Sequence, residues 1–226
     1  MDSIKIMSFF QLKNKISIAL KLSKVKITIA VAFTTITGYV LGKGYYDTGF
    51  IGVTIGIFLL ACGSSVLNQL QEKSIDAIMD RTHNRPLPTG AINSKKALGL
   101  ALFEIVIGSL IIFLTANFQL LILGWLALFW YNLVYTPLKS ITPHAVIPGS
   151  VIGAIPPLIG WIAAGGSLSD FRAWVVAVFF FVWQVPHFYL LVLKYGTQYE
   201  KAGLPALTSR HNHKVIRYLI FIWILT

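Results

Sequence analysis

Four polar residues recur at every fourth position after a long apolar run: Asn68, Glu72, Asp76 and Asp80. On an α-helix, a step of four residues advances about 6 Å and rotates by only about 40°, so all four would project from one face. Carboxylates at this spacing repel one another, and a bound cation would offset that repulsion. Oxygen ligands favour Mg²⁺, which commonly bridges carboxylates to substrate phosphates. We therefore predict these four residues as metal ligands. The alternative is a solvated helix whose acids pair with nearby basic side chains.

Two arginines directly follow the acidic repeat. Arg81 and Arg85 carry guanidinium groups that can hold phosphate oxygens, in a bidentate manner where the geometry allows. Pro86, Pro88 and Gly90 then predict the end of the helix.

Two further polar sets lie in later apolar runs at helical spacing. They are Asn132, Tyr135 and Lys139 in one run, and Gln184, His187 and Lys194 in another. Each set would share one face of a helix. In alternative interpretations, Lys139 and Tyr135 are ordinary interfacial residues, and His187 is paired with a neighbouring helix. An ionisable residue within a membrane span is nevertheless a functional candidate by default.

The elements that must position these residues are transmembrane helices. Of the 226 residues, 56% are hydrophobic and only 12% are charged, about half the usual charged share of roughly 25%. A span needs about 20 mostly apolar residues. We predict an all-α polytopic bundle with spans over residues 27–42, 49–67, 97–116, 118–135, 145–168 and 173–193. Because a seventh run begins near Tyr218 and meets the last residue, the bundle is expected to be incomplete at its C-terminal end. The single cysteine, Cys62, excludes an intramolecular disulfide.

The basic residues orient the predicted bundle. All of the 19 Lys and Arg residues except Lys43 and Arg172 fall on one side of the spans, which the positive-inside rule assigns to the cytoplasm. The net charge of +11 therefore belongs to membrane loops and does not indicate nucleic-acid binding. We expect a cytoplasmic amphipathic segment over residues 1–26, a transmembrane bundle over 27–226, and a location in the bacterial inner (plasma) membrane. The six lysines of the segment, with no arginine, argue against a mitochondrial presequence.

The acidic repeat and the residues after it resemble the first signature of the UbiA-type intramembrane prenyltransferases. The matching residues are Asn68, Glu72 and Asp76, followed by Arg81-Thr82-x-Asn84-Arg85-Pro86-Leu87. The resemblance implies that Asn68, Glu72 and Asp76 bind Mg²⁺, which holds a polyprenyl diphosphate, with Asp80 as an additional or alternative ligand. Glu72 stands where most members of the family have Asp.

Further motifs resemble the haem branch of that family, the protoheme IX farnesyltransferases. They are Tyr135-Thr136-Pro137-Leu138-Lys139, Pro156-Pro157-Leu158-Ile159-Gly160-Trp161 and Trp183-Gln184-Val185-Pro186-His187-Phe188. The glycines and prolines of the second motif and the residues before it predict a closely packed and interrupted fifth span. The resemblance implies farnesyl diphosphate and haem b as substrates, Mg²⁺ as cofactor, the lipid bilayer as environment, and an association with terminal-oxidase assembly.

The resemblance also implies a role for each candidate. The reaction would depend on Asn68, Glu72, Asp76, Tyr135 and Lys139; the diphosphate would contact Arg81, Arg85, Lys139 and Lys194; and the acceptor side would hold Asn132, Gln184 and His187. The segment Thr197-Gln198-Tyr199 lacks the acidic pair that many haem-branch members carry, which leaves Glu200 as the nearest carboxylate. The alternatives are a UbiA-type enzyme with a quinone-precursor or lipid acceptor, and a truncated inactive homologue.

Overall fold

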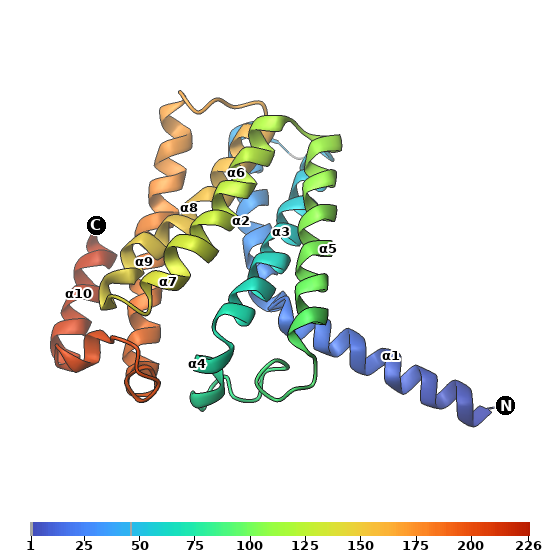
Figure 1. Ribbon diagram of the computed structural model, residues 1–226. Helices are drawn as coiled ribbons and strands as arrows, with labels where there is room; N and C mark the ends of the chain where they lie inside the picture. Colours follow the sequence, from blue (N-terminus) through green and yellow to red (C-terminus); the bar gives the residue numbers. More distant parts are fainter. Residues whose placement is uncertain (1, 46) are drawn as a thin grey trace.

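The computed structural model describes residues 2–45 and 47–226, with side chains from residue 11 onward apart from residue 46 (Figure 1). Its long helices are α1 (Asp2–Leu22), α2 (Val25–Lys43), α3 (Phe50–Gln71), α5 (Ser94–Thr115), α6 (Phe118–Phe129), α8 (Val146–Ala163), α9 (Phe171–Lys201) and α10 (His213–Leu225). Its short elements are α4 (Lys73–Ile78), a π-helix (Trp130–Tyr135), α7 (Thr136–Leu138) and the 3₁₀ turns Pro143–Ala145 and Leu207–Ser209. The described residues form no β-strand.

Six helical segments are long and apolar enough to cross a membrane. They are Val25–Lys43, Phe50–Gln71, Ser94–Thr115, Phe118–Leu138, Pro143–Ala163 and Phe171–Lys201. The fourth combines α6, the π-helix and α7, and the fifth begins with the 3₁₀ turn. The predicted all-α bundle of six spans is therefore confirmed, and the protein is a multi-pass membrane protein. The last span is longer than predicted: its 31 residues extend about 46 Å, beyond the roughly 30 Å hydrocarbon layer.

Short polar side chains fix where several helices begin. Asn93, Asn117 and Asn212 each accept a hydrogen bond from the backbone N–H three residues ahead, and Asp170 accepts one two residues ahead. These bonds satisfy N–H groups that the first helical turn leaves without a partner. The loops between apolar runs therefore define the helix boundaries.

Helix α8 lies at the centre of the bundle and packs against α2 on one side and α9 on another. Helix α3 packs against both α2 and α5. The backbones of α2 and α8 approach so closely that a Cβ atom on Gly38 or Gly160 would clash with carbonyl oxygens of the facing helix. The close packing predicted for the fifth span is present.

The predicted interruption of that span is wrong. Helix α8 continues through Pro156 and Pro157. Each proline removes one backbone hydrogen bond, which leaves the carbonyls of Ile152 and Gly153 without their usual helical donors. Both of these residues line a cavity between the helices, where such a gap in a membrane helix is tolerated.

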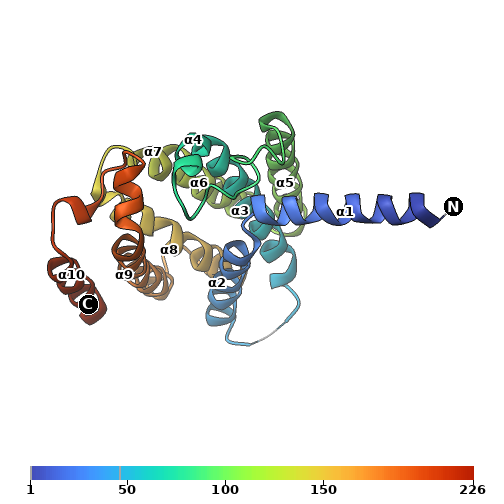
Figure 2. The same ribbon diagram turned by 90° about the horizontal axis from the view of Figure 1, so that it is seen from below.

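Helix α1 projects away from the bundle, as both views show (Figures 1 and 2). It ends at Leu22, and α2 begins at Val25, so the bend lies slightly before the predicted boundary at residue 26. Lys24, within the bend, has φ 47° and ψ 48°. It is the one non-glycine residue with positive φ in the described chain. This left-handed conformation costs roughly 1–2 kcal/mol for an L-residue. Whether α1 lies in the membrane interface stays a prediction.

The close approach of α2 and α8 makes stability sensitive to one methyl group. We expect Gly160→Ala to lower the free energy of unfolding by about 1–3 kcal/mol, because the new Cβ meets the backbone of Thr35 and Tyr39. Gly99→Ala on α5 is the matched control, since no atom lies within 4 Å of its added Cβ. Thermal unfolding in detergent compares the two variants. Equal melting temperatures would contradict the close approach of the two backbones.

Candidate functional site

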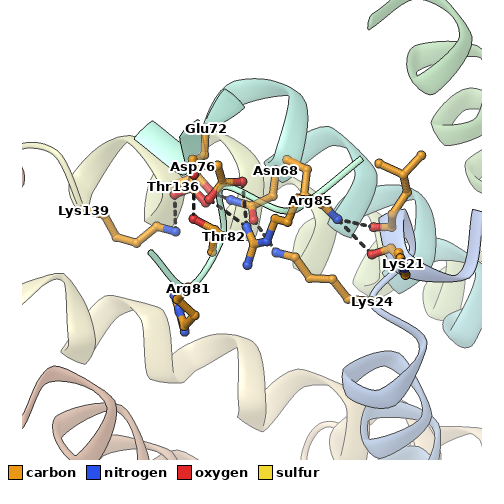
Figure 3. Close-up of polar contacts among 12 residues, drawn as sticks. Lys21, Lys24, Asn68, Glu72, Asp76, Arg81, Thr82, Arg85, Thr136 and Lys139 are labelled. Carbon is orange, nitrogen blue, oxygen red and sulfur yellow. Dashed lines mark hydrogen bonds and ion pairs between the residues drawn. The ribbon is translucent and has the colours of Figure 1, made fainter. Parts of the chain in front are cut away.

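A cavity of about 700 Å³ opens among helices α2, α3, α8, α9 and the fourth span. Its lining is largely apolar and includes Ile57, Leu60 and Ile159. Charged and polar side chains gather where the cavity meets the ends of α3 and α7 (Figure 3). We call these residues the charged mouth: Lys24, Asn68, Glu72, Asp76, Arg85 and Lys139.

Asn68 lies at the centre of the charged mouth and is fully buried. Its Oδ1 accepts hydrogen bonds from Lys24 Nζ at 2.6 Å and from the Tyr131 hydroxyl at 3.2 Å. Its Nδ2 donates to the Thr136 hydroxyl at 3.0 Å. These contacts fix which amide atom faces which neighbour, so Asn68 is held in place by three other elements of the bundle.

Each of the two carboxylates in the mouth has a cationic partner (Figure 3). Glu72 pairs with Lys139. Both oxygens of Asp76 accept from Nη1 of Arg85, at 2.8 and 2.7 Å. The Thr82 hydroxyl donates to the Asp76 backbone carbonyl at 3.0 Å, which folds the loop carrying Arg85 back over α4. The two paired carboxylates lie beside Asn68.

These three residues have the donor chemistry that Mg²⁺ requires. Asn68, Glu72 and Asp76 offer an amide oxygen and two carboxylates to one cavity. No group of three or more His, Cys, Asp and Glu side chains gathers anywhere in the part of the chain that the structure describes. A set of two carboxylates suits Mg²⁺, which retains waters and takes substrate phosphates as further ligands.

The structure does not bring Asp80 to this set. Helix α4 ends at Ile78, and Met79 adopts an extended conformation, so the four-residue repeat leaves the helix before it reaches Asp80. The Asp80 side chain is exposed and does not line the cavity. The prediction of one helical face therefore fails at its fourth member.

Lys24 belongs to the charged mouth although the sequence indicated only a loop lysine. Burial, together with the positive charges of the nearby Arg85 and Lys139, lowers the pKa of Lys24 to about 7. The sequence pattern assigned it to a separate N-terminal segment, and no helical repeat connects it with Asn68. The left-handed bend that brings it inward leaves no periodic pattern.

Arg81 lines the cavity, whereas Lys194 does not. The Arg81 guanidinium lies 4.7 Å from the Tyr195 ring centroid, and its Nη2 donates to the Tyr199 hydroxyl at 3.3 Å. Lys194 is exposed. Around α9, Lys194 lies only about 20° from His187, so the two share a helical face, but at this level the cavity is lined by Leu191, Val192 and Tyr199. The prediction that Lys194 lines the same cavity as His187 is therefore wrong.

Asn132 also departs from its predicted position. The π-helix over Trp130–Tyr135 has a wider turn than an α-helix and changes which residues share a face. Tyr131, Tyr135 and Lys139 line the cavity. Asn132 is instead buried against α3, where its Nδ2 donates to the Ser64 hydroxyl at 2.5 Å. It does not reach the acceptor side.

The far wall of the cavity carries a row of rings. Tyr131 and Tyr135 stack with their centroids 5.7 Å apart, and Tyr135 stacks on Phe188 at the same separation. His187 lies next to Phe188 and stacks on Trp183 at 5.5 Å with an interplanar angle of 12°. All five rings line the cavity, and Trp183 is about half exposed.

Two predicted residues, Gln184 and His187, lie together on this wall. Small residues of α8 make the room: Gly149 packs against the Tyr135 ring, and Gly153 packs against the Gln184 side chain. A Cβ at either glycine would press into that neighbour. The arrangement offers a charged group of binding residues at one end of an apolar cavity and an aromatic surface along its wall.

The sequence was compared with models of known protein families. The UbiA prenyltransferase family matches residues 31–226. The chain belongs to this family. Membership confirms the prediction made from the acidic repeat and the motifs after it.

Curated relatives agree with the predicted branch of the UbiA family. The protoheme IX farnesyltransferase of Oleidesulfovibrio alaskensis is 34% identical over 87% of this chain and 70% of its own length. That of Geobacter sulfurreducens is 41% identical over 75% of this chain and 62% of its own length. The chain thus aligns with between three fifths and seven tenths of the length of these relatives.

A UbiA homologue from Archaeoglobus fulgidus, solved with GPP and Mg²⁺ bound, shares the fold. Its TM-score is 0.71 at 15% identity, covering 91% of this chain and 73% of the other. At this identity the likeness establishes the fold alone. It confirms that the predicted helical bundle is the UbiA arrangement.

The different positions of Lys139 and Lys194 generate a test. We expect Lys139→Met to weaken the binding of farnesyl diphosphate by about ten- to a hundredfold, because a charge-assisted contact at the mouth is lost. Lys194→Met should bind farnesyl diphosphate as the unaltered protein does, since the Lys194 side chain is exposed and lies outside the cavity lining. Calorimetric titration in detergent with Mg²⁺ compares them. Equal losses in both variants would contradict the placement of Lys139 inside the cavity and of Lys194 outside it.

Proposed function

We propose that the protein transfers a farnesyl group from farnesyl diphosphate to a vinyl group of haem b, which produces haem O. The observation that supports this most strongly is the cavity itself, which joins a mouth of oxygen ligands and cations to a long apolar interior. An isoprenoid diphosphate has the same division between a highly charged head and an apolar tail. The relatives named protoheme IX farnesyltransferase support the choice of acceptor.

The charged mouth would bind the diphosphate. Arg85, Lys139 and Lys24 supply cationic donors to its oxygens, and Arg81 faces them from beside α9. Mg²⁺, bound by Asn68, Glu72 and Asp76, would neutralise part of the charge that develops as the diphosphate departs. Donors fixed in advance at that position stabilise the leaving group without having to reorganise during the reaction.

The reaction balances without a redox partner. The bond between farnesyl C1 and the diphosphate oxygen breaks, and the diphosphate leaves with the electron pair. The terminal vinyl carbon of the acceptor supplies electrons for a new bond to C1. Water adds to the cation that remains on the acceptor and loses a proton, which gives the hydroxyethylfarnesyl group.

The wall of five aromatic rings suits both the allylic cation and the haem acceptor. The ring of Tyr135 lies 4.9 Å from Lys139 Nζ, so its face already tolerates a positive charge beside the mouth. The stacked rings of Trp183 and His187 offer a flat surface on the same wall. Gln184 adds a polar group there. The apolar lining would keep bulk water from the allylic cation.

The proposed setting is the inner (plasma) membrane of a bacterium, with the N-terminus and the charged mouth on the cytoplasmic side. The asymmetric distribution of lysine and arginine supports this orientation. An association with terminal-oxidase assembly follows from the proposed product, because haem O would have to reach an oxidase.

A pair of aspartates tests the proposal. We expect Asp76→Asn to reduce haem O formation by at least about a hundredfold, since a metal ligand and the partner of Arg85 change together. Asp80→Asn should retain activity because Asp80 is exposed outside the cavity. Mass spectrometry of haem extracted from expressing cells measures the product.

A quinone-precursor or lipid acceptor would give Mg²⁺-dependent diphosphate release without haem O. An inactive homologue would give neither product. Full activity in Asp76→Asn would remove Asp76 from the metal site, and inactivity in Asp80→Asn would contradict the exclusion of Asp80.

A further inference from the structure

The bend between α1 and α2 is held by buried groups that the proposed reaction does not use. Lys24 occupies a left-handed conformation there, and its ammonium group lies 2.6 Å from Asn68 Oδ1. L-residues adopt this conformation only where the surroundings impose it. The contacts of the three preceding residues show what imposes it.

Gln69 holds the end of α1. Its Nε2 donates to the backbone carbonyl of Leu22 at 2.6 Å and to that of Lys21 at 3.3 Å. Both carbonyls belong to the last turn of α1, whose carbonyls lack the regular helical donors; that of Lys21 also accepts from the Lys24 backbone N–H at 3.3 Å. Gln69 is fully buried and directly follows Asn68 on α3. One turn of α3 therefore contacts the bend twice, through Gln69 to the backbone and through Asn68 to Lys24.

Glu104 holds the bend from α5. The Ser23 hydroxyl oxygen lies 2.6 Å from Glu104 Oε1 and 3.0 Å from the Ala19 carbonyl. A hydroxyl has one hydrogen, so both contacts are satisfied when Ser23 donates to Ala19 and a neutral Glu104 carboxyl donates to Ser23. Glu104 is only 8% exposed, and its Oε2 has no hydrogen-bond partner among the described residues. An acid inside a membrane span is unfavourable unless it serves a specific contact.

We propose that Glu104 and Gln69 are positioning residues that hold the α1–α2 bend and so direct Lys24 to the diphosphate end of the cavity. This inference rests on the proposed function because it gives Lys24 a diphosphate to bind. It also makes a claim about the bend alone: without the contacts from α3 and α5, residues 22–24 relax and the Lys24 side chain leaves the mouth.

Glu104→Leu and Glu104→Gln separate this role from simple packing. Leucine removes the contact to Ser23, whereas the glutamine amide keeps a donor of the same shape. We expect Glu104→Leu to weaken farnesyl diphosphate binding by about tenfold, the effect of losing one charged contact, and Glu104→Gln to retain binding. Lys24→Gln should weaken farnesyl diphosphate binding by a similar factor. The Glu104→Leu/Lys24→Gln double variant should bind farnesyl diphosphate as well as Lys24→Gln alone does.

The matched control is Ser109→Ala, which removes another interhelical hydrogen bond of α5, the one from Trp125 Nε1 at 3.1 Å. It should bind farnesyl diphosphate normally. If Glu104→Leu fails to fold, as judged by thermal unfolding, Ser23→Ala removes the same contact from the other side and is expected to weaken binding as Glu104→Leu would. Additive losses in the double variant, or normal binding in Glu104→Leu, would overturn the inference.

A measurement without ligand distinguishes this inference from the proposed function. In a Cys62→Ala background, which removes the single native cysteine, a Lys24→Cys thiol reports access to the bend by its rate of labelling with a water-soluble maleimide. Glu104→Leu should raise that rate, and Glu104→Gln should not. No binding of farnesyl diphosphate in the unaltered protein, together with this labelling pattern, would contradict the proposed function alone. Equal labelling rates in the Lys24→Cys protein with Glu104 unchanged, with Glu104→Leu and with Glu104→Gln would overturn the positioning role.

Discussion

Five charged side chains meet where an apolar cavity opens, and their mutual neutralisation constrains much of the bundle. Removing an ion from water costs several kcal/mol unless a partner of opposite charge compensates. Glu72 and Asp76 are each paired with a cation, on Lys139 and Arg85 respectively. Lys24 has only the Asn68 amide as its hydrogen-bond partner among the described side chains, and burial lowers its pKa to about 7. The mouth therefore has three basic residues for two carboxylates, and an anionic ligand would favour the charged form of Lys24.

Tyr135 connects this charged end with the aromatic wall. Its ring contacts Lys139 on one side and stacks on Phe188 on the other. Gly149 gives the ring its space, and the π-helix sets its direction. The central helix α8 has no side chain at Gly149 and Gly153, which leaves space for the Tyr135 ring and the Gln184 side chain. It also lacks two backbone hydrogen bonds, at Pro156 and Pro157, beside the cavity.

The sequence predicted what depends on local periodicity and composition. Apolar runs defined the six spans, and the four-residue repeat brought Asn68, Glu72 and Asp76 to one cavity. The prediction of site residues from spacing failed where the regular helical repeat ends, changes or does not decide which residues reach the cavity. Met79 ends the helix before Asp80, and the π-helix moves Asn132 away from Tyr135. Lys194 shares a helical face with His187 but lies outside the cavity lining. Lys24 was missed because a left-handed bend and contacts from α3 and α5 bring it inward, and no spacing rule encodes either one.

The opposite side of the mouth shows how a site with few carboxylates can hold a highly charged ligand. The segment 197–199 carries Gln198 and Tyr199 close to Arg81: the Gln198 side chain accepts from the Arg81 backbone N–H at 3.2 Å, and Tyr199 accepts from its guanidinium. Glu200 is exposed and accepts instead from the Thr208 hydroxyl at 2.7 Å. The end of α9 therefore positions a cation, the Arg81 guanidinium, beside the cavity. Guanidinium and ammonium groups fixed by neighbouring rings and amides can neutralise phosphate oxygens without a further ion. The mouth thus combines few carboxylates with several basic residues, and both features suit an anionic ligand.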